Sequence, residues 1–83
     1  MHMETLLPVQ KRFRLLFYLI AKPRTPTELA SLERKHLSDV SRSLRELRNM
    51  GLVEAKTSGS RERYYSVTED GLFVYTMLSH QSR

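Results

Sequence analysis

The sequence predicts a single, mainly α-helical domain of 83 residues that also carries a small β-hairpin. Three observations support this fold class. Residues 37–50 have the apolar spacing of an amphipathic helix, and a strong start for a separate, shorter helix lies upstream at residues 25–28. Two short strand-like runs around a polar, glycine-containing loop then follow. Two adjacent helices and a hairpin are the parts of a helix-turn-helix with an attached wing.

The first helix is expected over residues 9–21, after an N-terminal segment, residues 1–8, that lies outside the fold. Basic residues precede its apolar run, which is the order found in a signal peptide. The run ends in Lys22-Pro23-Arg24 without a small-residue cleavage pattern. It is also much shorter than the ~20 residues that a membrane-spanning helix needs. We therefore expect a folded helix and no membrane association.

The next helix has a well-defined expected start. Thr25 can cap it, Pro26 suits the first helical position and Glu28 is placed to complete a capping box. The helix should continue through Leu32. Residues 33–35 then separate it from the following helix, which is the spacing of a tight turn between two helices.

The helix expected over residues 37–50 has two different faces. Its apolar residues fall on one side and can enter a core: Leu37, Val40, Leu44 and Leu47. Its opposite side gathers Ser38, Arg42, Arg45 and Asn49, while Asp39 and Glu46 lie off the centre of that face. Gly51 is a natural end because glycine readily adopts a left-handed conformation. Such a polar face is either solvated or offered to a partner, and its neighbours favour the second interpretation.

The hairpin expected after Gly51 has strand-like runs on both sides of a loop that starts at Thr57. Arg61 and Arg63 lie on the returning side of its tip, which places the wing at about residues 57–63. Arginines there can reach phosphates or a narrow minor groove. A merely solubilising loop explains this feature equally well when it is taken alone.

Three stretches together, TPTELA, LSDVSRSLRELRNMGLVE and YYSVTEDGLFV, resemble winged helix-turn-helix regulators of the MarR and ArsR type, in particular compact archaeal and bacterial members. The resemblance covers about residues 9–79 and leaves residues 80–83 as a tail. It implies a transcriptional regulator that binds specific double-stranded DNA, with the helix over residues 37–50 in the major groove. The positions implied to meet base edges are Ser38, Asp39, Ser41, Arg42 and Arg45. The sequence departs from the family at His36, where Ser or Thr usually caps, and in the turn at residues 33–35, where Gly is common.

The remaining DNA contacts are expected from the flanking elements. Thr25 and Thr27 should hold phosphates through hydroxyls and backbone amides, and Arg61 and Arg63 should contact DNA from the wing. The formal net charge of +5 and the sequence pI near 10.0 suit a polyanionic partner.

Both terminal helices carry more apolar surface than one small core can use, because a chain this short buries only about 60% of its unfolded surface. In the first helix, one apolar stripe contains Val9, Phe13, Leu16, Phe17 and Ile20, and the other side carries Leu15, Tyr18 and Leu19. The last helix, capped by Thr68, is apolar around its axis. We therefore expect a homodimer through Leu15, Tyr18, Leu19, Phe73 and Met77. Mutual packing of these helices within one chain is the alternative.

Enzymatic chemistry is not expected. The chain has no cysteine, its three histidines lie far apart, and it carries no phosphate loop, nucleophile elbow or carboxylate pair. We therefore expect no cofactor and no metal, and a cytoplasmic location fits the lack of cysteine. No polar cluster indicates a small-molecule effector. Two other functions are open: a winged-helix module that docks protein and an RNA-binding module.

Overall fold

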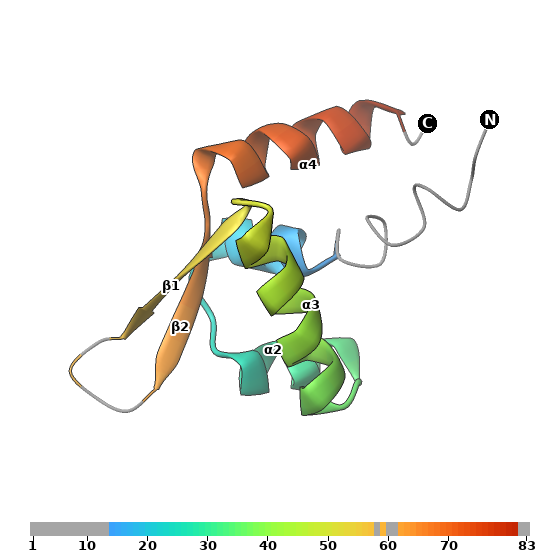
Figure 1. Ribbon diagram of the computed structural model, residues 1–83. Coiled ribbons are helices and arrows are strands. Elements are labelled where there is room, and N and C mark those ends of the chain that lie inside the picture. The colour runs from blue at the N-terminus through green and yellow to red at the C-terminus, as the bar shows by residue number, and fades with distance from the viewer. Residues whose placement is uncertain (1–13, 58, 60–61, 82–83) are drawn as a thin grey trace.

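The computed structural model describes residues 14–57, 59 and 62–81. Residues 14–21 are helical and are followed by α2 (Pro26–Glu33), α3 (Leu37–Asn49), β1 (Val53–Thr57), β2 (Arg63–Val67) and α4 (Glu69–Gln81). In Figure 1, the helical segment 14–21 lies between α4 above and α2 below, and the hairpin extends to the left. The predicted combination of helices with a small hairpin is confirmed.

The hairpin is a regular antiparallel pair that pairs Val53 with Val67 and Thr57 with Arg63. A third segment joins its other edge, which the sequence did not predict. Arg24 forms an isolated bridge with Tyr65, with backbone N–H···O distances of 3.0 and 2.9 Å in the two directions. The connection between the first helical segment and α2 is thereby attached to β2.

The start of α2 forms the predicted capping box. The Thr25 hydroxyl accepts a hydrogen bond from the Glu28 N–H at 3.1 Å, and the Glu28 carboxylate accepts one from the Thr25 N–H at 2.9 Å. At the other end, Arg34 adopts a left-handed conformation with φ of 56°. The following N–H, that of Lys35, bonds to the Ala30 carbonyl at 3.0 Å. This pattern closes the helix and turns the chain toward α3.

Gly51 ends α3 as expected, with φ of +77°. Its N–H bonds to the Arg48 carbonyl at 2.9 Å, and the Leu52 N–H bonds to the Leu47 carbonyl at 2.9 Å. A side chain at position 51 would strain this left-handed turn. The chain therefore leaves α3 sharply and enters β1 within three residues.

The start of α4 is fastened to this same corner. The predicted cap, Thr68, accepts a hydrogen bond from the Gly71 N–H at 3.0 Å and donates one to the Gly51 carbonyl at 2.7 Å. Its own N–H bonds to the Leu52 carbonyl at 3.0 Å. Gly71 is buried here, and a Cβ at its position would collide with the Leu52 carbonyl oxygen. The close approach of α4 to the α3–β1 corner therefore requires glycine.

The core is made by side chains from the first helical segment, α2, α3 and the hairpin. Its members are Leu15, Leu16, Leu19, Leu29, Ala30, Val40, Leu44, Leu47, Leu52, Val53 and Tyr65. The predicted division of the first helix is wrong, because Leu15 and Leu19, assigned to the outward side, are only 4% and 2% exposed. The apolar run from Leu15 to Ile20 would allow either side of the helix to face the core. Packing against α2 and α3 selects the orientation that buries Leu15 and Leu19. Neither leucine is therefore available for a dimer interface in this fold.

A second correction concerns Leu37, which was expected in the core and is 48% exposed. It is the first residue of α3, one turn before Val40, so it lies at the edge of the packed region. The rest of the apolar side of α3 is buried as expected.

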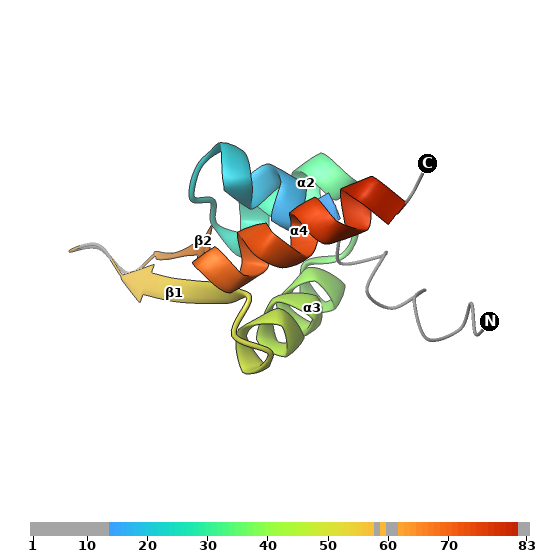
Figure 2. The same ribbon diagram turned by 90° about the horizontal axis from the view of Figure 1, so that it is seen from above.

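The helix α4 lies on the outside of the domain. Viewed from above in Figure 2, it runs across the helical segment 14–21. The side chains of residues 69–80 are half-buried at best, and Leu72, Phe73 and Met77 are 46%, 65% and 45% exposed. In the part of the chain that the structure describes, no helix has the length and apolar character needed to cross a membrane.

Candidate nucleic-acid interface

The helix α3 presents a polar face to the outside and an apolar face to the core. Val40, Leu44 and Leu47 are 2%, 0% and 2% exposed, which fixes the rotation of the helix about its axis. The expected outward residues Ser38, Arg42, Arg45 and Asn49 are all exposed, and Ser41 is half-buried at the edge of the face. The structure therefore brings five of the predicted polar residues together on one side of one helix.

Asp39 lies closer to this face than the sequence indicated. Its carboxylate oxygen is 4.0 Å from a guanidinium nitrogen of Arg42, one turn along the helix. The two side chains are 53% and 69% exposed, so their attraction is weak and screened by solvent. Arg45, by contrast, is exposed one turn further on.

The first turn of α3 is open to the outside. His36 is the residue before the helix, and its side chain makes no capping hydrogen bond. Its carbonyl accepts hydrogen bonds from the N–H groups of Asp39 and Val40, at 3.1 and 3.2 Å. Because the N–H groups of a first helical turn point outward and carry partial positive charge, this end suits an anion such as a phosphate. The His36 side chain itself covers none of the N–H groups of this turn.

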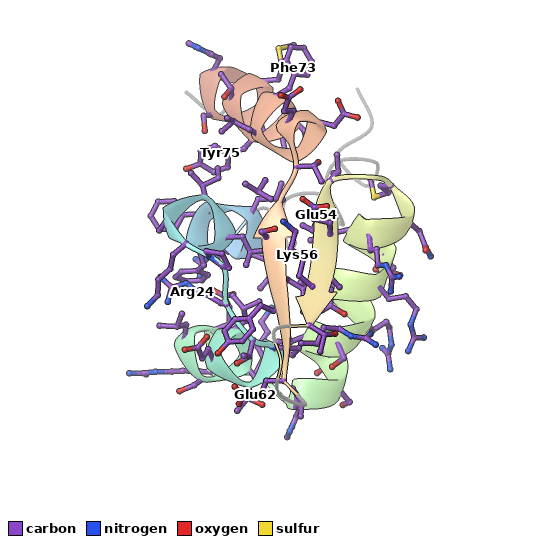
Figure 3. All side chains as sticks on the ribbon, turned by 90° about the vertical axis from the view of Figure 1, so that its left-hand side faces the viewer. Arg24, Glu54, Lys56, Glu62, Phe73 and Tyr75 are labelled. Carbon is purple, nitrogen blue, oxygen red and sulfur yellow. The ribbon has the colours of Figure 1, made fainter. Side chains whose placement is uncertain are left out.

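Both strands of the wing are described, together with residues 59 and 62 of the loop between them. Arg63 is exposed and pairs with Thr57 at the loop end of the hairpin. The pairing places Arg63 on the same sheet face as the buried Tyr65, so it extends the core-facing side of the hairpin outward. Lys56 and Glu54 belong to the opposite face, as Figure 3 shows. The predicted contact at Arg61 lies outside the described residues.

The start of α2 is less suited to DNA than expected. Thr25 is 8% exposed and its hydroxyl accepts the Glu28 N–H in the capping box, so little of it is open to a phosphate, and its predicted DNA contact stays a prediction. Thr27 is exposed, and it lines an open depression of about 500 Å³ together with the carboxylates of Glu28 and Glu62. Two nearby carboxylates would repel a phosphate.

Tyr64 lines the same depression as Glu62. Its hydroxyl donates a hydrogen bond to Glu62 at 3.3 Å. The negative charge of Glu62, with this hydrogen bond, raises the pKa of Tyr64 above its usual value of 10.0. Tyr64 is thus held by an acidic neighbour on the side of the hairpin that carries Lys56.

Sequence reasoning missed a polar contact behind the interface. Tyr18, expected in a dimer face, is half-buried, and its hydrogen-bonding interaction with the carboxylate of Glu33, the last residue of α2, raises the pKa of Tyr18 above its usual value of 10.0. Stability gained from a raised tyrosine pKa is present below pH 10 and is lost as the pH rises through the folded-state pKa. The Glu33 side chain is only 3% exposed and lies 4.0 Å from the Arg14 guanidinium. A glutamate in a charged turn gives no sequence indication of such burial.

Arg24 holds the other side of Tyr18. Its Nε donates a hydrogen bond to the Tyr18 carbonyl at 3.1 Å, and its guanidinium lies 5.9 Å from the centre of the Tyr18 ring. Tyr18 therefore connects the first helical segment with α2 and, through the Arg24 bridge, with β2. Among the residues that the structure places, no cluster of three or more histidine, aspartate or glutamate side chains could hold a metal ion.

Solved structures share this fold. A mutant of ZitR from Lactococcus lactis has a TM-score of 0.78 and 18% identity, covering 86% of this chain and 50% of that one. The transcriptional regulator HlyU from Vibrio vulnificus CMCP6 has a TM-score of 0.73 and 23% identity, covering 89% of this chain and 77% of that one. The chain spans about half the length of the ZitR structure.

A third structure is the homodimeric winged helix-turn-helix DNA-binding domain of a possible ArsR-family transcriptional regulator from Mycobacterium bovis. Its TM-score is 0.76 and its identity 24%, covering 96% of this chain and 80% of that one. These likenesses establish a winged helix-turn-helix fold. No curated protein has a sequence that matches significantly.

The sequence itself matches a family that is described as "Bacterial regulatory protein, arsR family". The match extends over residues 10–55, which include α2, the turn, α3 and the start of β1. These are the elements that form and orient the polar face described above. The chain therefore belongs to the arsR family of bacterial regulatory proteins.

Proposed function

We propose that this protein regulates transcription by binding a specific double-stranded DNA sequence, with α3 in the major groove. The observation that carries the proposal is the two-sided character of α3, in which a buried apolar row fixes the helix and a row of exposed polar residues faces outward. An α-helix fits the major groove, where side chains can read the edges of the bases. The family to which the chain belongs supports the same assignment.

The residues have different roles in this proposal. Arg45 and Arg42 reach guanine edges or nearby phosphates, and Ser38 and Ser41 make shorter contacts beside them. Arg45 is the stronger candidate for base recognition because Arg42 has the Asp39 carboxylate beside it. Arg63, together with Arg61, contacts the DNA backbone or minor groove from the wing. Such contacts add affinity with little sequence preference.

We further propose that the protein is a homodimer. An apolar surface runs over the first helical segment and α4, where the exposed large residues are Phe17, Ile20, Leu72, Phe73 and Met77. Figure 3 shows Tyr75 pointing from α4 toward the first helical segment, while Phe73 lies on the outer side of α4. The rings of Phe17 and Tyr75 are 6.3 Å apart, so the two helices already share one apolar surface.

This surface differs from the interface expected from the sequence. Phe73 and Met77 belong to both, and Tyr18 is turned inward. Phe17 and Ile20 take the place of the buried Leu15 and Leu19. The homodimeric domain from Mycobacterium bovis supports a dimer of this fold. Two α3 helices about 34 Å apart would enter successive major grooves, so we expect a roughly palindromic site. Such a regulator would act in the cytoplasm, where bacterial DNA lies.

Docking of a protein is the second candidate function. Leu37, exposed at the start of α3, offers one apolar anchor for a partner. The centre of the outward face is polar, however, whereas protein interfaces depend on buried aromatic or aliphatic anchors. RNA binding is less well supported because Tyr65 is buried and Tyr64 is half-buried, which leaves no open stacking platform on the described part of the hairpin.

A competition experiment tests the proposed function. A labelled random-sequence duplex DNA, bound to the full chain, is challenged with unlabelled duplex DNA, duplex RNA or single strands at several salt concentrations. We expect duplex DNA to compete best, and the affinity to fall steeply with salt because phosphate contacts release counterions. Equal competition by RNA or single strands, or no DNA binding at low salt, would contradict the proposal.

A further inference from the structure

Tyr18 joins three parts of the molecule that are separate in the sequence. Its hydroxyl meets Glu33 at the end of α2, and its ring and carbonyl meet Arg24, which is bridged to β2. Its ring also makes an edge contact with Phe17, at a centroid distance of 5.6 Å. Phe17 belongs to the exposed apolar surface through which we propose dimerisation. Tyr18 therefore lies directly behind that surface.

Glu33 is an unusual residue to bury at this position. Its side chain is 97% removed from solvent, and its Oε2 atom has no hydrogen-bond partner. Arg14, which is 75% exposed, is 4.0 Å from that same oxygen and supplies the compensating charge. Because a buried carboxylate that is left unpaired is strongly unfavourable, Glu33 holds its partners in place, and these partners come from the first helical segment.

Glu33 also lies next to the recognition helix. The left-handed residue Arg34 follows it directly, and α3 begins three residues later. Glu33 lines an open depression of about 420 Å³ together with His36, Asp39 and Arg42 from the start of α3. The turn that sets the direction of α3 is therefore anchored, through one buried carboxylate, to the helix that carries Phe17.

We propose that Glu33, held by Tyr18 and Arg14, is a positioning residue that fixes the orientation of α3 relative to the dimer surface. The inference rests on the proposed DNA binding and dimerisation, and it adds a specific coupling between them. A single α3 can enter a single groove in any orientation of the rest of the molecule. Two helices in one dimer bind together only if both point correctly, so looseness at this turn weakens bivalent binding.

The test compares duplexes that contain one or two half-sites, taken from sequences that the wild-type protein selects. Tyr18→Phe removes only the hydroxyl, and Glu33→Gln keeps the shape but removes the charge. Arg14→Gln alters an exposed side chain, so it can still test the network if Tyr18→Phe and Glu33→Gln fold poorly. Tyr64→Phe is the matched control because it removes another tyrosine–carboxylate hydrogen bond, on the far side of the hairpin. Sedimentation measures dimerisation of every variant under the same conditions.

For Tyr18→Phe and Glu33→Gln, we expect affinity for the two-half-site duplex to fall about tenfold, or about 1.4 kcal/mol. Affinity for one half-site should change less than about twofold, and dimerisation should be unchanged. Arg14→Gln should shift the ratio of the two affinities in the same direction, and Tyr64→Phe should not. The variant that carries both Tyr18→Phe and Glu33→Gln should lose less affinity for the two-half-site duplex than the sum of the two single losses, because both substitutions disrupt the same network.

Several outcomes would overturn the inference. Equal losses on both duplexes would assign Glu33 a general structural role, and loss of the dimer would assign it to assembly. If Arg14→Gln, Tyr18→Phe and Glu33→Gln all leave the ratio of the two affinities unchanged, the network does not position α3. These results differ from failure of the proposed function, in which the wild-type protein itself binds no duplex. A wild-type protein that binds one half-site as tightly as two would contradict dimeric binding.

Discussion

Arg34 occupies a conformation that a residue with a side chain adopts only with strain. Its φ of 56° closes α2 and redirects the chain toward α3. The left-handed region costs an L-residue about 1 kcal/mol or more, whereas glycine enters it readily.

We expect Arg34→Gly to be more stable than Arg34→Ala by about 1 kcal/mol, because both changes remove the charge and only the first relieves the strain. Urea unfolding followed by circular dichroism measures this difference. Equal stabilities of the two variants would show that the turn does not impose the left-handed conformation.

In the proposed complex with DNA, Arg45 is the residue on which we expect base recognition to depend most. We expect Arg45→Ala to weaken specific binding by about 1 to 3 kcal/mol and to relax the preference at one base pair. Arg63→Ala should weaken all sequences about equally and lower the salt slope by about one. Fluorescence anisotropy with matched and mismatched duplexes separates the two effects. An Arg45→Ala protein with unchanged preference would remove Arg45 from the base-reading site.

Residue-level predictions succeeded where the cause is local. The capping box at Thr25, the stop at Gly51 and the cap at Thr68 each follow from a few adjacent residues, and the structure contains all three. Predictions that needed a tertiary partner did less well. Burial of Glu33 depends on Tyr18 and Arg14, which lie far away in the sequence, and burial of Thr25 depends on packing around the cap.

At the scale of elements, α4 depends on a few polar contacts at its start. Only Gly71 among its described side chains and backbone positions is buried, so the Thr68 hydrogen bonds to Gly51 and Gly71 do much to fix where the helix begins. The same threonine holds the end of α3 and the start of α4 together. The corner is therefore a single unit made by three elements.

We expect Thr68→Val to destabilise the fold by about 1 to 2 kcal/mol, because it removes a helix cap and a hydrogen bond to the Gly51 carbonyl. Thr76→Val is the matched control, since Thr76 bonds only to the carbonyl of Leu72 within an exposed part of the same helix. Thermal unfolding of the two variants is compared with that of Thr68→Ser, which should retain most of the stability. A loss of similar size in both valine variants would contradict a special role for Thr68.

The order and type of elements could be predicted because apolar spacing and turn residues mark each of them. The bridge between Arg24 and Tyr65 could not, because a single paired residue leaves no strand-like run in the sequence. The rotation of the first helical segment failed for a related reason. Its apolar residues occur on both sides, so the spacing alone does not indicate which side meets the core.

At the scale of the whole molecule, the charges and the apolar surface have separate places. Arg42, Arg45 and Arg48 are exposed along α3, and most of the exposed large apolar side chains lie on the first helical segment and α4. In the proposed dimer, this division leaves α3 free to contact DNA. Composition alone predicted the excess of positive charge, but its location became clear only from the fold.

We expect Phe73→Asp to convert the dimer to a monomer, because Phe73 is 65% exposed in one chain and a carboxylate there would be buried in the interface. Ser31→Asp, on an exposed position of α2 outside this surface, is the control for added charge. Sedimentation equilibrium at micromolar concentration gives the masses. The interface is wrongly placed if Phe73→Asp stays dimeric, and dimerisation itself is wrong if the wild-type protein sediments as a monomer.

Selection of bound sequences from a random duplex library by the 83-residue protein tests directly whether α3 binds a specific DNA sequence. We expect the selected duplexes to share two inverted half-sites whose centres are about 10 base pairs apart. We also expect the protein with Arg45→Ala to lose the preference at one position of each half-site. Bound sequences as random as the starting library would contradict sequence-specific binding by α3.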